Sequence, residues 1–159
     1  MAGDPTPPAP FAVRSSEGER IPLRGNTVTL KATGAETGGV LTFTEIEATP
    51  GGGPPVHVHD HCEEWFYVLE GAFDIVLGDD VVRAEPGDFA YVPRGTPHRF
   101  ASAVSGTARL LAAFTPTGLE DFFRAAGGHH MSQTVFEDAG ADHDTRVVEW
   151  KGAGKPAAD

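Results

Sequence analysis

The sequence predicts an all-β domain with a short helical segment towards its C-terminal end. Short apolar segments are separated by turn-forming residues about every ten positions, which is the spacing of strands in a sandwich or barrel. The chain contains 20 Gly and 13 Pro, a content that favours turns over long helices. Its 159 residues are enough for one domain with a core of its own.

Several segments have the alternation of apolar and polar residues, or the β-branched and aromatic composition, that is typical of strands. We expect strands over residues 27–31, 40–48, 65–69, 73–77, 81–84, 89–92 and 108–115, and one that begins at His98. Residues 32–39 are rich in Gly and Thr, and residues 49–55 in Gly and Pro. We therefore expect a turn and a loop at these two places.

A helical pattern follows the last expected strand. Thr117 and Glu120 have the spacing of a capping box. The residues that follow place apolar side chains on one helical face and end in two glycines, so we expect a helix over residues 119–126. Residues 133–139 fit either another short helix or an edge strand.

These patterns divide the chain into four parts. Residues 1–10 are Pro-rich and are expected to form a flexible arm. Residues 11–116 hold the expected barrel, and residues 117–150 a helical or edge segment that packs against it. Residues 151–159 are expected to be a frayed tail.

Charge and composition exclude several classes of partner. A net charge of -11 argues against binding to a nucleic-acid backbone or to an anionic membrane surface. The chain has no apolar run of about 18 residues and does not open on a basic region followed by an apolar one. Cys62 is the single cysteine, as expected for a protein of a reducing compartment. Together these features predict a cytoplasmic protein.

The most informative stretch, residues 51–71, reads GGGPPVHVHDHCEEWFYVLEG. Because strand side chains alternate between faces, His57 and His59 point the same way. Two imidazoles and a carboxylate beside an apolar strand must be paired, hydrogen-bonded or bound to a metal. The stretch has the form G-x5-H-x-H-x4-E-x6-G, given by Gly51, His57, His59, Glu64 and Gly71.

A second stretch, residues 86–100, reads PGDFAYVPRGTPHRF. It has the form G-x5-P-x-G-x2-H, given by Gly87, Pro93, Gly95 and His98. These two stretches resemble the two motifs of the cupin family, and the resemblance extends over roughly residues 40–115. The sequence departs from the second motif at position 102, where Ser replaces the family's Asn.

The resemblance implies a double-stranded β-helix, the cupin jelly-roll barrel. It also implies that four residues hold one divalent transition metal, namely His57, His59, Glu64 and His98. Such ligands suit Fe, Ni, Cu, Mn and Zn alike, which leaves the identity of the metal open. Glu63 competes with Glu64 for the carboxylate role, and the motif spacing favours Glu64.

Among cupins, the chain is similar to the small single-domain proteins that include bacterial quercetin-type dioxygenases. That similarity implies a dioxygenase that uses O2 on a hydroxylated aromatic or flavonol-like molecule, with Glu64 also acting as general base. The alternatives are a non-redox cyclase or isomerase of the aromatic polyketide type, and a cupin that binds a metal or ligand without turnover. The resemblance further implies a homodimer.

Other residues near the two motifs have open roles. His61 fits either the cavity or an exposed loop, and Cys62 fits a small buried residue better than a nucleophile. His129 and His130 are weak candidates for a further ligand. The arginines that flank His98, Arg94 and Arg99, fit contacts with loop carbonyls or with an acidic group of a substrate.

The aromatic residues are candidates for the core or for the cavity wall. Within the barrel these are Phe43, Phe66, Phe73, Tyr91, Phe100 and Phe114, of which alternation should turn about half inward. In the expected helix, Phe122 and Phe123 fit either a lid over the barrel mouth or plain packing of the helix on the barrel.

Overall fold

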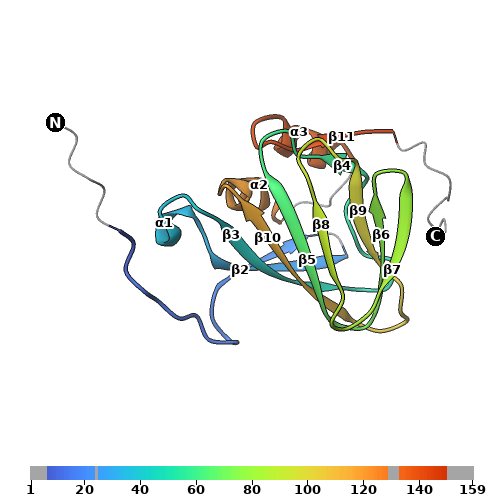
Figure 1. The fold of residues 1–159 in the computed structure, drawn as a ribbon, viewed down its shortest axis with the longest axis horizontal. Helices are drawn as coiled ribbons and strands as arrows, with labels where there is room; N and C mark the ends of the chain where they lie inside the picture. The colour runs from blue at the N-terminus through green and yellow to red at the C-terminus, as the bar shows by residue number, and fades with distance from the viewer. Residues whose placement is uncertain (1–6, 24, 129–132, 150–159) are drawn as a thin grey trace.

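The computed structural model describes residues 7–23, 25–128 and 133–149, which form two antiparallel sheets with short helices beside them (Figure 1). The six-stranded sheet has the order β1 (Glu19–Leu23), β2 (Asn26–Ala32), β3 (Thr42–Ala48), β10 (Ala108–Thr115), β5 (Glu63–Glu70) and β8 (Phe89–Val92). The five-stranded sheet has the order β11 (Arg146–Val147), β4 (His57–Val58), β9 (His98–Ser102), β6 (Phe73–Leu77) and β7 (Asp80–Ala84). The helices are α1 (Gly34–Thr37), α2 (Leu119–Ala126) and α3 (Gln133–Ala141). The expected all-β jelly roll with a C-terminal helical part is confirmed.

Strict alternation along the central strands produces the core. Every second residue of β3, from Thr42 to Ala48, is buried, and the residues between them are partly exposed. Across the ladder Ile46 pairs with Leu110, and both side chains are almost fully buried. Phe66 and Phe73 are likewise buried, and each such aromatic side chain stabilises the fold by about 1.5–3 kcal/mol through its removal from water.

The outer face of the β5–β8 pair is aromatic. Trp65 pairs with Tyr91, and Tyr67 pairs with Phe89, on the strand at the edge of the sheet. Tyr67, Phe89 and Tyr91 are all exposed. Tyr91 is therefore one of the sequence candidates that faces away from the interior.

The homodimer expected from the resemblance stays a prediction.

The structure adds three elements that the sequence patterns did not indicate. Residues 32–39 were expected to be only a turn, but they contain α1, which Thr33 and Glu36 cap reciprocally and Gly38 ends at a φ of 67°. β1 and β11 are also new. β1 is mostly exposed and β11 has two residues, so neither shows a buried alternation. The undecided residues 133–139 lie within a helix, α3.

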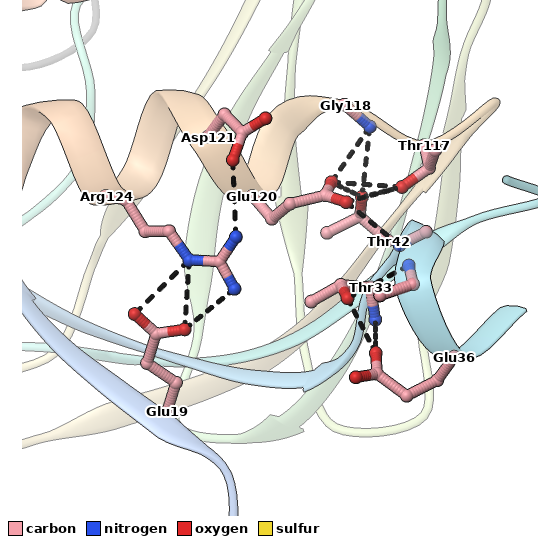
Figure 2. Close-up of polar contacts among 11 residues, drawn as sticks. Glu19, Thr33, Glu36, Thr42, Thr117, Gly118, Glu120, Asp121 and Arg124 are labelled. Carbon is pink, nitrogen blue, oxygen red and sulfur yellow. Dashed lines mark hydrogen bonds and ion pairs between the residues drawn. The ribbon is translucent and has the colours of Figure 1, made fainter.

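The capping box expected at the start of α2 is wrong in its details. The helix begins after Gly118, and no side chain caps that end in the expected way. Instead the Glu120 carboxylate turns inward, where it accepts hydrogen bonds from Gly118 N at 2.8 Å, from Gly34 N at 2.9 Å, and from the Thr117 and Thr42 hydroxyls (Figure 2). This one side chain joins the start of α2 to α1 and to β3.

A second, exposed contact attaches the other side of α2. Arg124 donates to Glu19 of β1 at 2.9 Å and to Asp121 at 3.2 Å (Figure 2). Exposed pairs of this kind contribute about 0–1 kcal/mol. The buried Glu120 network is therefore the stronger polar link between the helix and the sheet.

None of the helices in the described ranges is both long and apolar enough to span a bilayer. Residues 1–6 of the expected arm and the expected tail, residues 151–159, lie outside the described residues. The division of the chain into four parts therefore stays a prediction.

We predict that Glu120→Gln lowers the free energy of unfolding by about 1–3 kcal/mol near neutral pH, because it weakens several hydrogen bonds to a buried, charged acceptor. Although burial acts to raise the pKa of Glu120, the hydrogen bonds from Thr42 and Gly34 lower it to about 2, against an ordinary value of 4.5. A group with a lowered pKa stabilises the fold above its ordinary pKa and loses that effect as pH falls.

Urea unfolding followed by tryptophan fluorescence tests this prediction between about pH 7 and pH 2. The difference between the native protein and Glu120→Gln should shrink as pH falls from about 5 towards 2. Asp121→Asn, at an exposed position of the same helix, is the matched control and should change little. A Glu120→Gln variant as stable as the native protein at neutral pH would contradict the role of this network.

Candidate metal centre

Strand geometry brings the four motif residues together from both sheets. His57 lies in β4 and His59 follows the end of that strand, and His57 pairs directly with His98 of β9. Glu64 comes from the opposite sheet, at the start of β5. The exposed fractions are 5% for His57, 3% for His59, 4% for Glu64 and 1% for His98, so the cluster is buried.

The ligand atoms of these residues converge on one point. Each residue offers one nitrogen or oxygen atom, and these atoms all lie within 4.8 Å of one another. Glu64 Oε2 lies 2.7 Å from His98 Nε2 and 3.3 Å from His59 Nε2. The carboxylate predicted by the motif spacing therefore stands among the imidazoles.

Backbone carbonyls hold each imidazole from its other side. His57 Nδ1 lies 2.8 Å from the Pro55 carbonyl oxygen, and His98 Nδ1 lies 2.8 Å from that of Thr96. His59 Nδ1 lies 2.7 Å from the carbonyl oxygen of Asp144. Because a carbonyl only accepts, each Nδ1 donates in its contact, which leaves the Nε2 atom of each ring free to bind a metal when it carries no proton.

Burial and the close approach of these groups shift the pKa values of His57, His59 and Glu64. Burial, followed by the charges of His98 and His59, lowers the pKa of His57 well below its ordinary value. Burial acts to raise the pKa of Glu64, but the neighbouring imidazoles of His59 and His98 outweigh it and lower the pKa to about 2. Burial acts to lower the pKa of His59, but the Glu64 carboxylate outweighs it and raises the pKa.

The cluster fits a metal ion better than it fits a purely structural role. His59 Nε2 is buried without a hydrogen-bond partner among the described residues, and it makes no hydrogen bond to Glu64 in spite of its proximity. A buried polar atom of this kind is costly unless something binds it. Imidazole nitrogens with one carboxylate oxygen form a donor set that Fe, Ni, Cu, Mn and Zn all accept.

The neighbouring carboxylate, Glu63, faces away from the cluster. Its Oε1 lies 2.8 Å from Arg94 Nε in an ion pair near the surface. Arg94 therefore contacts Glu63, and among the described residues it makes no hydrogen bond to a loop carbonyl. Arg99 is half-buried, and its Nε is a buried atom without a hydrogen-bond partner in the described part of the chain.

The loop after β4 holds His61 and Cys62, whose roles the sequence left open. His61 is exposed, as in the second of its two expected positions, and its backbone N–H donates to the Asp144 carboxylate at 2.9 Å. Cys62 is buried, and burial raises the pKa of its thiol, so it is no activated nucleophile. His129 and His130 lie outside the described residues.

The cluster opens onto a pocket of about 450 Å³, within the size range of small-molecule sites. Its lining includes His57, His59 and Glu64, the loop at residues 49–55, and five phenylalanines: Phe100, Phe114, Phe122, Phe123 and Phe136. Of the barrel candidates, Phe66 and Phe73 are core residues that do not line this pocket. Phe122 and Phe123 are buried and pack in the core, which favours packing of the helix on the barrel over a lid.

Four residues that contribute to the site had no signal in the sequence. Asp144 and Thr145 contact His59 across more than eighty positions, and Phe136 comes from a segment that could not be assigned to helix or strand. Asn26 lines the pocket, where its Oδ1 is buried without a hydrogen-bond partner among the described residues. Such contacts depend on the tertiary fold, so spacing along the chain does not reveal them.

Comparison with known proteins supports this description. Over 91 residues the chain is 33% identical to the quercetin 2,3-dioxygenase of Bacillus subtilis, a match that covers 57% of this chain and 27% of that protein. Over 71 residues it is 28% identical to the tetracenomycin polyketide synthase protein TcmJ of Streptomyces glaucescens, covering 45% of this chain and 48% of that protein. The matched regions thus span between about a quarter and a half of these curated relatives.

Solved structures give the same fold. KdgF from Halomonas sp. superposes with a TM-score of 0.61 at 20% identity, over 68% of this chain and 94% of that one. An RmlC-like cupin from Shewanella frigidimarina gives a TM-score of 0.60 at 19% identity, over 69% and 93% of the two chains. Residues 44–114 also match the family model described as a cupin domain. The chain therefore contains a cupin domain, whose jelly-roll barrel buries the cluster of three histidines and one glutamate.

Proposed function

We propose that this protein is a metal-dependent dioxygenase that acts on a hydroxylated aromatic or flavonol-like small molecule. One observation carries the proposal. A buried cluster of three imidazoles and a carboxylate adjoins a pocket that is lined by phenylalanine side chains. The similarity to the Bacillus subtilis quercetin 2,3-dioxygenase supports the choice of reaction.

In this proposal the Nε2 atoms of His57, His59 and His98 and the carboxylate of Glu64 hold one divalent transition metal. When bound, a redox-active ion would supply a site at which O2 reacts with the substrate, whereas Zn would supply a Lewis acid alone. Both oxygen atoms of O2 enter the product, so the reaction needs no further reductant.

The chain's own residues bind and orient the substrate. Flat rings pack well against aromatic side chains, and the phenylalanine walls of the pocket exclude water from the reacting groups. Glu64 is ionised, and we assign its carboxylate as the acceptor of the substrate's hydroxyl proton. The buried Oδ1 of Asn26 is available to accept a hydrogen bond from a second polar group of the substrate.

A second candidate function uses the same residues without redox chemistry. The similarity to the Streptomyces glaucescens protein TcmJ, a polyketide synthase protein, favours a cyclase or isomerase of the aromatic polyketide type. In that case Zn would be the expected ion, and the pocket would hold a polyketide-like substrate. The third candidate is a cupin that binds a metal or ligand without turnover, and the experiments below separate all three.

We predict that the protein, purified without an affinity tag, carries about one Fe, Ni, Cu, Mn or Zn ion per chain by elemental analysis. His57→Ala and His98→Ala should each lower the metal affinity by at least about tenfold, because each removes one imidazole ligand from the buried set. His61→Ala is the matched control, since this exposed histidine lies two positions from His59. A loss in the control equal to that in His98→Ala would contradict the assigned ligands.

We predict that the protein loaded with a redox-active ion consumes O2 in the presence of a flavonol or a catechol. An oxygen electrode measures the uptake, and mass spectrometry with 18O2 should find both labelled atoms in the product. The same protein loaded with Zn is the control and should take up no O2. Glu64→Gln should lower turnover in samples matched for bound metal, because the amide cannot accept the hydroxyl proton.

The outcomes divide the candidates. Zn in the purified protein, together with turnover of a polyketide-like substrate and no O2 uptake, would favour the non-redox enzyme. Tight binding of an aromatic ligand without any turnover would favour the binding protein. Either result would overturn the dioxygenase proposal and leave the metal ligands as assigned.

A further inference from the structure

The three imidazoles of the cluster are not supported in the same way. His57 and His98 each contact the carbonyl of the residue two positions earlier, Pro55 and Thr96, within their own loops. His59 instead contacts the carbonyl of Asp144, 85 positions further along the chain. That carbonyl lies outside residues 44–114, the part that matches the cupin domain. The orientation of the His59 imidazole therefore depends on a segment outside the matched residues.

Asp144 contacts the histidine loop with its side chain as well as with its backbone. Its carboxylate accepts hydrogen bonds from Asp60 N at 2.9 Å and from His61 N at 2.9 Å, the two backbone groups that follow His59. Its φ of 51° lies in the left-handed region, which Asp and Asn adopt more readily than other side chains. The residue type thus suits a backbone that turns its carbonyl and its carboxylate towards the same loop.

The residues that surround Asp144 anchor it to the barrel. Thr145 is buried, and its Oγ1 lies 3.4 Å from His59 Nδ1. β11 pairs with β4 through Arg146 opposite Val58 and Val147 opposite His57. Val148 N donates to the Val56 carbonyl at 3.0 Å. Strand β4, which carries His57 and leads directly to His59, is therefore bonded on one side to the C-terminal segment.

Helix α3, which precedes this segment, packs closely against it. A Cβ atom placed on Gly140 would lie 2.1 Å from the Thr145 carbonyl oxygen, so the helix and the segment meet without room for a side chain. Phe136 of the same helix places its ring 5.3 Å from that of His57. The contact between α3 and the segment thus restricts how far Asp144 can move away from His59.

We propose that Asp144 is a positioning residue that raises the affinity of the cluster for its metal by fixing the ring of His59. This inference rests on the metal centre of the proposed function and extends it to a segment beyond the cupin domain. Groups that orient a ligand in this way typically change metal affinity by about 10–100-fold when they are removed.

A competing explanation is a second metal site formed by His59, Cys62 and Asp144, whose ligand atoms also lie close together. Two observations argue against it. The Asp144 carboxylate oxygens already accept hydrogen bonds from two backbone N–H groups, and His59 Nδ1 lies 2.7 Å from the Asp144 carbonyl oxygen, at the distance of a donated hydrogen bond. The positioning role predicts one bound ion per chain, and a second site predicts two.

The test compares the metal affinity of the full-length protein with that of Asp144→Ala and Asp144→Asn, by competition with a chromophoric chelator for Zn and for Co. We expect Asp144→Ala to weaken binding by about 10–100-fold. Asp144→Asn keeps the left-handed preference and one side-chain acceptor, so it should restore most of the affinity. Asp142→Ala, at an exposed position of the same segment, is the matched control and should bind like the native protein.

Two further readouts separate positioning from general stability. The melting temperature of each metal-free variant reports on folding, and the visible absorption spectrum of the Co-loaded protein reports on the ligand geometry. We expect an altered Co spectrum in Asp144→Ala and a native spectrum in Asp144→Asn. If Asp144→Ala does not fold, Asp144→Gly accommodates the positive φ and removes the same carboxylate, and it should weaken binding as well.

A folded Asp144→Ala or Asp144→Gly variant with native affinity and a native Co spectrum would overturn the proposal. Two ions per chain in the native protein, reduced to one in Asp144→Ala, would establish the second metal site instead. Native protein that binds metal but turns over no substrate would count against the dioxygenase alone. Native protein that binds no transition metal would overturn both proposals.

Discussion

The structure depends on the burial of a carboxylate among three imidazoles inside a mainly apolar barrel. All four side chains are at most 5% exposed, so they have lost most of their contact with bulk water. Burying these polar groups costs free energy. The contact between Glu64 and His98 and the three backbone carbonyls that hold the rings offset part of that cost. His59 Nε2 has no hydrogen-bond partner among the described residues, so these residues alone leave the cluster incomplete. A bound cation, as in the proposed function, would supply the missing partner.

Three parts of the structure position the cluster and form its pocket. The pairing of β4 with β9 sets His57 against His98, and the opposite sheet brings Glu64 to them. Helix α2, held to β3 by the Glu120 network, adds part of the aromatic wall of the pocket. The segment around Asp144, in the C-terminal part of the chain, contacts the ring of His59 through the Asp144 carbonyl. The barrel thus supplies the candidate ligands, while the C-terminal part shapes both the pocket and the setting of His59.

The jelly-roll barrel and the four clustered residues could be predicted because two stretches of the sequence resemble the cupin motifs, whereas local patterns alone indicated only a sandwich or barrel. A two-residue period places His57 and His59 on one face, and motif spacing favours the buried Glu64 over Glu63, which is partly exposed and pairs with Arg94. The rest depends on tertiary contacts. Asp144 shows no relation to His59 along the chain, and Glu120, which has the spacing of a cap, binds β3 and α1 instead. Short, exposed strands such as β1 carry too little buried alternation to be recognised.

The most direct test of the metal centre is anomalous X-ray diffraction from crystals of the protein loaded with one transition metal, with data collected on both sides of its absorption edge. The account predicts a single anomalous peak per chain, bounded by the Nε2 atoms of His57, His59 and His98 and by the Glu64 carboxylate. A peak beside Cys62 and Asp144, on the Nδ1 side of His59, would contradict it. The absence of a peak among the three histidines in metal-saturated crystals would contradict it as well.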